Sequence, residues 1–317
     1  MPPAAVDIGG TKIQVVDAGP QTAQVAELAT PVHDGPDAIV DRIAAALTSL
    51  PAPGPVVVAS AGSLDVARGV VHYAANLPFT EFPLTTRLEA AVRRPVRLIG
   101  DAVAAAVGEF TTGAAAGHRD GVYITVSTGI GMGIVIGGRL VTGRADQAGE
   151  LGHIPVVTGP RVLRCSCGQS GCLEAYASGR ALAARAAAAG VLPAGPGRGP
   201  LTARDVVARA RAGDTTATAL LDETLGLLAT GVACVVRLLA PPVVVLGGGL
   251  LVAGGLLDPL RRRVAAILAA TVPDIEGVML ACAHGRFSSV RGAALIARAD
   301  PTAIALLDGT TTTEDIS

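Results

Sequence analysis

Apolar residues are spaced along this chain in two patterns, and the two patterns alternate. Short, largely apolar runs at residues 56–59, 96–99, 122–126 and 243–246 are typical of strands buried on both faces of a parallel sheet. In other segments apolar residues recur every three or four positions or alanine predominates, which predicts helices over residues 37–50, 101–110, 181–189, 203–212 and 217–239. The alternation predicts an α/β protein.

Two segments share a further order, in which a strand enters a glycine-rich turn and leaves as a second strand. Residues 4–16 form the first, and residues 24–29 are predicted to add a third strand to it. The second runs from Gly121 through a turn at 127–133 to a strand at 134–136. The likeness predicts an internal duplication, with one glycine hairpin in each of two lobes.

The length of 317 residues also favours two lobes. We expect residues 1–111 with 289–307 to form a small N-terminal lobe and residues 112–288 a large C-terminal lobe. The Gly- and Pro-rich stretch 190–200 is predicted to be a loop, and residues 308–317 a disordered tail. Because substrates often bind between lobes and at strand ends of open α/β sheets, we expect a ligand cleft between the two.

Composition narrows the class of protein. With 50% hydrophobic and 16% charged residues the chain can bury a large core, which excludes an intrinsically disordered protein. The net charge is −1, Lys12 is the only lysine, and the one tight basic run, Arg261–Arg263, falls in a helical pattern where a solvated face is expected. We therefore expect neither a nucleic-acid partner nor a membrane partner.

The N-terminal residues show no leader pattern, and no unbroken apolar run reaches the ~18 residues of a membrane-spanning helix. We therefore expect a cytoplasmic protein. The mean hydropathy of +0.52 leaves much apolar surface to cover, and we expect a homodimer.

Three of the five cysteines, Cys165, Cys167 and Cys172, lie within eight residues. Disulfides are rare in a reducing compartment, so this crowding indicates a metal. With His153 the thiols would form a closed, structural Cys₃His site for zinc. The alternative is three separate buried thiols, but the spacing CxCGxxGC favours metal, because its glycines permit the sharp turns that bring the sulfurs together. The single cysteines, Cys234 and Cys282, are interpreted as core thiols.

The first glycine turn has the sequence Asp7-Ile8-Gly9-Gly10-Thr11-Lys12. Its glycines would let backbone N–H groups approach phosphate oxygens, and an aspartate just before them suits Mg²⁺ held through water. The alternative is an ordinary glycine-rich hairpin. A second turn, Ser127–Gly131, supplies further N–H groups and hydroxyls, and Gly247–Gly249 would let adenine or ribose lie against bare backbone.

Asp101 follows a buried strand at the start of a helix, which allows two interpretations. Aspartate is a favoured N-cap residue. It is also suited to act as a general base that accepts the proton of an attacking hydroxyl and orients it in line with a γ-phosphate. The glycine turns in the same chain favour the second interpretation.

These motifs resemble the ROK family (repressor, open reading frame, kinase) of sugar kinases, and the likeness runs from Val6 to about Ala299. Its strongest marker is the segment 150–174, where GELGH is followed by CSCGQSGCLE. The resemblance implies the two-lobed fold of the hexokinase, actin and Hsp70-type ATPases, with ATP, Mg²⁺ and a structural Zn²⁺. It implies Asp101 as catalytic base; nucleotide and phosphate contacts at Asp7, Gly9, Gly10, Thr11, Lys12, Thr128, Gly129, Gly131, Gly247, Gly248 and Gly249; sugar contacts at Gly62, Asn76, Glu150, His153 and Glu174; and zinc ligands at His153, Cys165, Cys167 and Cys172.

One position departs from the family pattern. Family kinases usually have Asn-Asp-Ala-Asn around the base, whereas this chain has Gly100-Asp101-Ala102-Val103. The missing amide would weaken glucose binding, because an unpaired substrate hydroxyl in a dry cleft costs ~1 to 3 kcal/mol. The extra room would equally admit an amino sugar or a sugar-like cyclitol.

We therefore predict ATP-dependent phosphorylation of a primary hydroxyl of a hexose, an amino sugar or a cyclitol. The alternative is a non-catalytic sugar-binding or regulatory protein of the same family. The family's repressors carry an N-terminal helix-turn-helix segment, and nothing before the first strand here would hold one. The aspartate at position 101 also favours the kinase.

Overall fold

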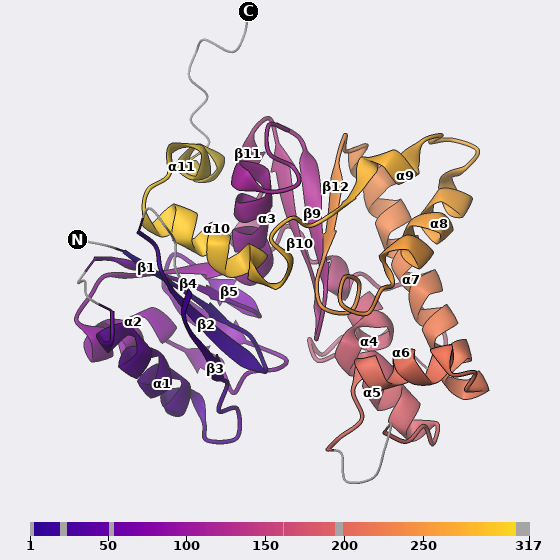
Figure 1. Ribbon diagram of the computed structural model, residues 1–317, viewed down its shortest axis with the longest axis horizontal. Helices are drawn as coiled ribbons and strands as arrows, with labels where there is room; N and C mark the ends of the chain where they lie inside the picture. Colours follow the sequence, from indigo (N-terminus) through magenta and orange to yellow (C-terminus); the bar gives the residue numbers. More distant parts are fainter. Residues whose placement is uncertain (1–2, 20–23, 51–53, 161, 194–198, 309–317) are drawn as a thin grey trace, which may run out of the picture. The chain divides into compact units, whose positions relative to one another are not determined.

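The computed structural model describes residues 3–19, 24–50, 54–160, 162–193 and 199–308 (Figure 1). This part of the chain forms two compact units: one contains the residues up to Tyr123, Gly133–Gly149 and the residues from Cys282 onward, the other Ile124–Met132 and Glu150–Ala281. The boundaries of these units differ from those of the two lobes that we expected, and the lobes stay a prediction. Of the predicted tail, Asp308 ends a helix, and residues 309–317 lie outside the described residues.

The first unit is built on a five-stranded sheet with the order β3-β2-β1-β4-β8. The predicted meander is confirmed as the antiparallel strands β1 (Ala4–Ile8), β2 (Lys12–Asp17) and β3 (Gln24–Ala29). The predicted buried strands are β4 (Val56–Ser60) and β8 (Val96–Gly100), which continue the sheet in parallel from β1. Because parallel strands place their carboxyl ends at one edge, the residues that end β1 and follow β8 lie along the same edge of the sheet.

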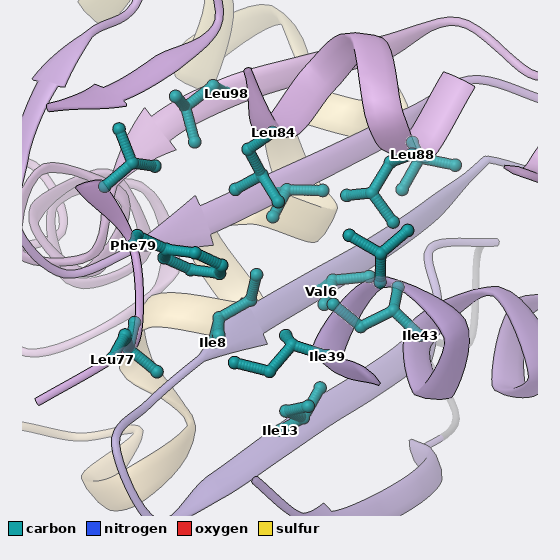
Figure 2. Close-up of a cluster of buried hydrophobic side chains, with 14 of the residues drawn as sticks. Val6, Ile8, Ile13, Ile39, Ile43, Leu77, Phe79, Leu84, Leu88 and Leu98 are labelled. Atoms are coloured by element: carbon teal, nitrogen blue, oxygen red, sulfur yellow. The ribbon is translucent and has the colours of Figure 1, made fainter. Parts of the chain in front are cut away.

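Alternation along β1 decides which side chains enter the core and which are left for chemistry. Val6 and Ile8 are fully buried in a cluster with residues of α1 (Pro36–Thr48) and α2 (Leu84–Val92), including Ile39, Ile43 and Leu88 (Figure 2). Asp7, between them, points to the opposite face of the sheet, where it contacts α10 (Ser288–Ala297). That face is also packed by α3 (Asp101–Thr112).

The remaining elements of the first unit are short. A three-stranded sheet, β5-β6-β7, follows β4 and consists of β5 (Ser63–Asp65), β6 (Val70–Tyr73) and β7 (Thr80–Phe82). Outside the second large sheet, the other elements of this unit are the 3₁₀ helices η1 (Arg144–Asp146) and η3 (Gly285–Phe287) and the helix α11 (Pro301–Asp308).

A second five-stranded sheet has the order β11-β10-β9-β12-β13, with strands β9 (Gly121–Val126), β10 (Ile130–Ile136), β11 (Arg139–Leu140), β12 (Val244–Gly247) and β13 (Met279–Ala281). When each sheet's strands are counted from its own first strand, both sheets have the same order, three-two-one-four-five. This repeat supports the predicted duplication. The predicted turn over residues 127–133 is wrong for 130–133, which belong to β10. Backbone hydrogen bonding to the neighbouring strands forms this strand, although its two glycines have no side chains that would indicate a strand from the sequence.

Helices make up most of the second unit. Besides η2 (Leu151–His153), they are α4 (Leu173–Ala177), α5 (Gly179–Ala188), α6 (Ala203–Arg211), α7 (Thr215–Leu239), α8 (Leu257–Leu268) and α9 (Ile275–Val278). Among the described residues, α7 is the one helix long and apolar enough to cross a membrane by length and composition, and half of its most apolar window is buried. It packs against α4, α5, α6 and α8, as the core helix of a globular protein does.

Candidate active-site and metal-binding residues

Asp7 and Asp101 form an acidic pair in the first unit. The Asp7 side chain lies on the face of β1 that packs against α10, where its Oδ1 accepts a hydrogen bond from the Ser289 hydroxyl at 2.8 Å. Burial, and next the negative charge of Asp101, raise the pKa of Asp7 to about 7, while the Ser289 bond lowers it. A site that disfavours a second negative charge in this way favours a bound cation, which fits the Mg²⁺ predicted here.

Asp101 is the first residue of α3, and the N-cap position is held by Gly100. Its Oδ1 accepts a hydrogen bond from the backbone N–H of Ala102 at 2.7 Å. Asp101 therefore lies one position past the N-cap, although its carboxylate still accepts an N–H group of the first helical turn. The Asp101 carboxylate follows β8 and lies near Asp7, so it remains available for the predicted role of general base.

Gly100 has φ −68° and ψ 141°, an extended conformation open to any residue. A Cβ built there would lie 3.5 Å from Cγ2 of Val103, an ordinary van der Waals distance. A turn that demands positive φ therefore does not explain this glycine. The glycine leaves room beside Asp101 without being required by the backbone.

The first glycine turn lies between β1 and β2 and is tied to its surroundings. The N–H of Gly9 donates to the Lys12 carbonyl at 2.9 Å, and the Gly9 carbonyl accepts from Oγ1 of Thr30 at 2.6 Å. A Cβ on Gly10 would lie only 2.7 Å from the Cβ of Asn76, so this glycine lets the predicted sugar ligand Asn76 pack against the predicted phosphate turn. Thr11 is exposed in the same turn.

The lone lysine of the chain is already paired. The ammonium of Lys12 donates to Oε1 of Glu27 at 2.5 Å, and Arg286 lies 3.1 Å from the other oxygen of the same carboxylate. The hydrogen bond from Lys12 is the main reason that the pKa of Glu27 is lowered. The predicted contact Gly62 lies just after β4 in this unit.

The second glycine turn, Ser127–Gly129, is held by two helices of its own unit. The N–H groups of Gly179 and Arg180, at the start of α5, donate to the carbonyls of Ser127 (2.8 Å) and Thr128 (3.3 Å). The Glu174 carboxylate of α4 is buried and accepts the N–H of Ile130 at 2.9 Å. Glu174, predicted as a sugar ligand, thus also fixes the strand that leaves the turn and that contains Gly131.

The third glycine cluster packs on β9. Gly247 ends β12, and Gly248 has φ +93°, with the position of a Cβ occupied by the carbonyl of Val126. The same carbonyl accepts the N–H of Leu250 at 3.1 Å. At Gly249 a Cβ would meet only the Ser127 hydroxyl, at 3.8 Å, so this glycine leaves open backbone of the kind we predicted for an adenosine site.

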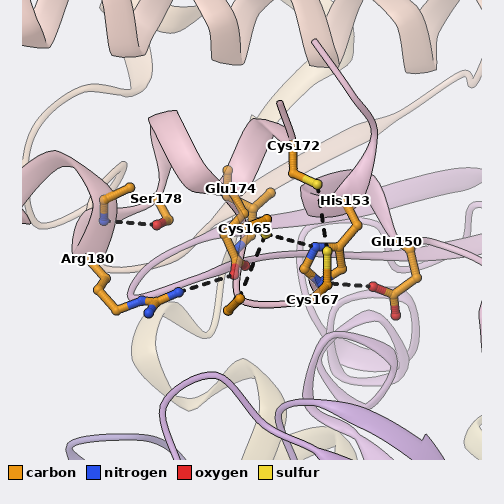
Figure 3. A network of polar contacts seen from close by, with 11 residues as sticks. Glu150, His153, Cys165, Cys167, Cys172, Glu174, Ser178 and Arg180 are labelled. Carbon is orange, nitrogen blue, oxygen red and sulfur yellow. Dashed lines mark hydrogen bonds and ion pairs between the residues drawn. The ribbon is translucent and has the colours of Figure 1, made fainter. Parts of the chain in front are cut away.

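His153, Cys165, Cys167 and Cys172 converge in the second unit, as the sequence predicted. Their ligand atoms all lie within 4.8 Å of one another (Figure 3). Nδ1 of His153 is 3.6 Å from Sγ of Cys165, and the sulfurs of Cys167 and Cys172 are 3.7 Å apart. Tetrahedral zinc with Zn–S ≈ 2.3 Å and Zn–N ≈ 2.0–2.1 Å separates such atoms by about 3.6 to 3.8 Å, and both of these distances match that separation, so the donor set fits zinc.

The chemistry of the donor set agrees with its geometry. Burial, and next the contact with the Cys167 thiol, raise the pKa of Cys172 to about 12. A metal ion is what permits thiols packed this closely to ionise together. Around the cluster, Nε2 of His153 faces Glu150 at 3.7 Å, and the Tyr176 hydroxyl of α4 accepts the N–H of Leu163 at 2.7 Å.

The two single cysteines differ. Cys282 is buried, as predicted, but the prediction is wrong for Cys234, which is exposed on α7. Sequence reasoning also missed Ser289, the hydrogen-bond partner of Asp7. Since Ser289 lies 282 residues along the chain from Asp7, no local signal could have linked the two.

Comparisons with known proteins agree with these observations. The profile of the ROK family matches residues 3–300. A glucokinase of Streptomyces coelicolor is 43% identical over 182 residues, a match that spans 56% of this chain and little more than half, 56%, of that protein. An N-acetylmannosamine kinase of Citrobacter koseri is 37% identical over 301 residues, 93% of this chain and 98% of that protein.

Among solved structures, the crystal structure of a ROK family glucokinase from Streptomyces griseus in complex with glucose and AMPPNP is 34% identical. It aligns with a TM-score of 0.76 over 94% of this chain and 100% of that chain. The α/β architecture, with its two sheets of equal strand order, is the actin-like ATPase fold that the sequence motifs implied. The chain belongs to the ROK family.

Proposed function

We propose that this protein is an ATP-dependent kinase that phosphorylates a primary hydroxyl of a hexose or a close analogue. The observation that carries the proposal is the acidic pair of the first unit. Burial raises the pKa of Asp7 to about 7, and Asp101, at the start of α3, is close enough for its negative charge to add to that rise. Two relatives that match nearly the whole chain, the N-acetylmannosamine kinase of Citrobacter koseri and the glucokinase of Streptomyces griseus, support the proposal.

In the first unit, Asp101 would accept the proton of the sugar hydroxyl and orient its oxygen toward the γ-phosphate. Asp7 would hold Mg²⁺ through water, beside the turn Gly9–Lys12 that approaches the phosphates. Bound with ATP, Mg²⁺ supplies charge neutralisation at the phosphoryl oxygens. Asn76 and Gly62 would contact the sugar.

In the second unit, the turn containing Thr128 and Gly129 would donate N–H groups to phosphate, and Gly247–Gly249 would contact the adenosine. Glu150, His153 and Glu174 would bind sugar hydroxyls. Zinc would take Nδ1 of His153, which faces Cys165, and leave Nε2 on the side of Glu150. Its chemistry would be structural, since four protein ligands close the coordination sphere.

The substrate follows from Gly100. Without an amide beside the base, plain glucose would lose a hydrogen bond, and a sugar with a changed substituent, such as an amino sugar, or a cyclitol would gain room. The relatives are named for both an unmodified hexose, in the glucokinase, and a hexose with a changed substituent, in the N-acetylmannosamine kinase. We propose in addition that the protein acts in the cytoplasm as a homodimer.

The direct experiment measures ADP release with Mg²⁺–ATP and a panel containing glucose, mannose, N-acetylmannosamine, glucosamine and inositol. Turnover on one or more members is expected, with the phosphorylated product identified by ³¹P NMR. Sugar binding measured by calorimetry without any ADP release would instead favour the non-catalytic regulatory alternative.

A further inference from the structure

Glu109, in the last part of α3, is a charged side chain with 0% exposure. Its Oε1 accepts the N–H of His284 (3.0 Å) and the hydroxyl of Ser288 (2.7 Å). Its Oε2 accepts the N–H groups of Ala114 and Ala283, both at 2.9 Å. Although burial raises the pKa of Glu109, these hydrogen bonds outweigh it and hold the pKa below its usual range. The ionised carboxylate therefore joins α3 to the segment 283–288 that leads into α10.

The residue after Ser288 reaches the candidate active site. Ser289 lies in the first turn of α10, and its hydroxyl donates to Oδ1 of Asp7 at 2.8 Å. A hydrogen bond to one carboxylate oxygen fixes the rotation of the whole group, and so the direction in which Asp7 presents its charge. The start of α10 thus decides how Asp7 is oriented.

α3 and α10 also approach each other too closely to slide. A Cβ on Gly292 of α10 would overlap the carbonyl of Ala104 in α3, and a Cβ on Gly108 would lie 2.7 Å from the carbonyl of Ser288. Because α3 begins at Asp101, this contact fixes both members of the acidic pair to one pair of helices (Figure 1).

We propose that Glu109 and Ser289 are positioning residues: Glu109 fixes the start of α10, and Ser289 on that helix orients the Asp7 carboxylate for the metal-bound phosphates. The role of the oriented Asp7 carboxylate in binding the metal and its phosphates rests on the proposed kinase function. The competing explanation is that Glu109 and Ser289 stabilise the fold and do nothing for Asp7.

The first test compares Ser289→Ala with Ser289→Thr, which keeps the hydroxyl. The probe is Mn²⁺ with AMPPNP, with Mn²⁺ affinity measured by electron paramagnetic resonance and unfolding followed in parallel. Ser289→Ala should bind Mn²⁺ about tenfold more weakly and Ser289→Thr within about twofold of the wild type, as expected for one hydrogen bond to a charged group. Ser49→Ala, which removes an exposed hydroxyl bonded to Ala46, is the control and should change nothing. Wild-type affinity in Ser289→Ala would overturn the proposal.

The second test asks whether Glu109 acts through Ser289. In Glu109→Gln the amide NH₂ must face backbone N–H groups, whichever way it is turned, so the start of α10 should loosen and Mn²⁺ binding should weaken. Adding Ser289→Ala to it should weaken binding no further, because both changes break one connection. Fully additive losses of Mn²⁺ affinity would overturn the proposal that Glu109 acts through Ser289. Glu89→Gln, at an exposed carboxylate that accepts the N–H of Val96, is the matched control.

Crystal structures of the wild type and Ser289→Ala without nucleotide separate this proposal from the proposed function. Retention of the wild-type Asp7 orientation in the variant would overturn the proposal, even if the protein proves to be a kinase. A rotated Asp7 in the variant would support it. Failure of the wild type to bind Mn²⁺–AMPPNP would count against the kinase function, while the Asp7 orientation would still decide the role of Ser289.

Discussion

Gly100→Asn restores the residue that the family pattern places before the base. Since Gly100 has φ −68° and ψ 141°, and a Cβ would meet Val103 at 3.5 Å, the new side chain should enter without backbone strain. If the amide reaches a substrate hydroxyl it should contribute one hydrogen bond, ~0.5 to 1.5 kcal/mol. That corresponds to a rise of about threefold to tenfold in kcat/KM for glucose relative to the other sugars.

Position 100 is also the N-cap of α3, where asparagine is preferred to glycine by a few tenths of a kcal/mol. Because an asparagine side chain at this position can also cap the helix, Gly100→Ser is the matched control: serine caps as well but has no amide. ADP release across the sugar panel and unfolding midpoints should be measured for both variants. Stability should be kept in both, and the shift toward glucose should appear in Gly100→Asn alone. A uniform loss on every sugar, or the same shift in Gly100→Ser, would refute the reasoning.

Three further predictions follow from individual contacts. Elemental analysis should find about one zinc per chain, and Cys167→Ser, but not Cys234→Ser, should lower both the unfolding midpoint and sugar affinity; fully active protein without zinc would contradict this. Because the folded pKa of Glu109 lies below its ordinary 4.5, its ionised form contributes stability above that pH, which is lost as the pH falls through the folded pKa. The difference in unfolding free energy between wild type and Glu109→Gln, from denaturant titrations, should therefore shrink below pH 4.5, and a difference independent of pH would count against this linkage. Gly10→Ala places a Cβ 2.7 Å from that of Asn76, so KM should rise for the sugar more than for ATP; steady-state kinetics with an unchanged sugar KM would exclude the contact.

The features that the sequence predicted correctly are those with a local signal. Strand β4 begins as an unbroken apolar run, β8 is a short apolar run broken only by Arg97, and the helix predicted at 37–50 is found at Pro36–Thr48. The convergence of His153 with the three cysteines was predictable for the same reason, because these four residues lie within 20 positions and their glycine spacing already implies convergence.

The features that sequence analysis missed depend on contacts between distant segments. Glu109 reads as one acidic residue on an alanine-rich helix, yet three of its four donors lie 174 to 179 residues further along the chain. The glycines are a second case. Gly10 was interpreted as a residue that lets the backbone approach a phosphate. In the structure, the space beside it is filled by Asn76, which only the folding of the chain brings there.

The central claim, that Asp101 is the base of a sugar kinase, is tested most directly by the turnover of Asp101→Asn. The amide is nearly isosteric with the carboxylate but cannot accept a proton, so kcat should fall by about 10²- to 10⁴-fold while ATP affinity and the unfolding midpoint stay near those of the wild type. Wild-type kcat in this variant, on the best sugar of the panel, would contradict the account.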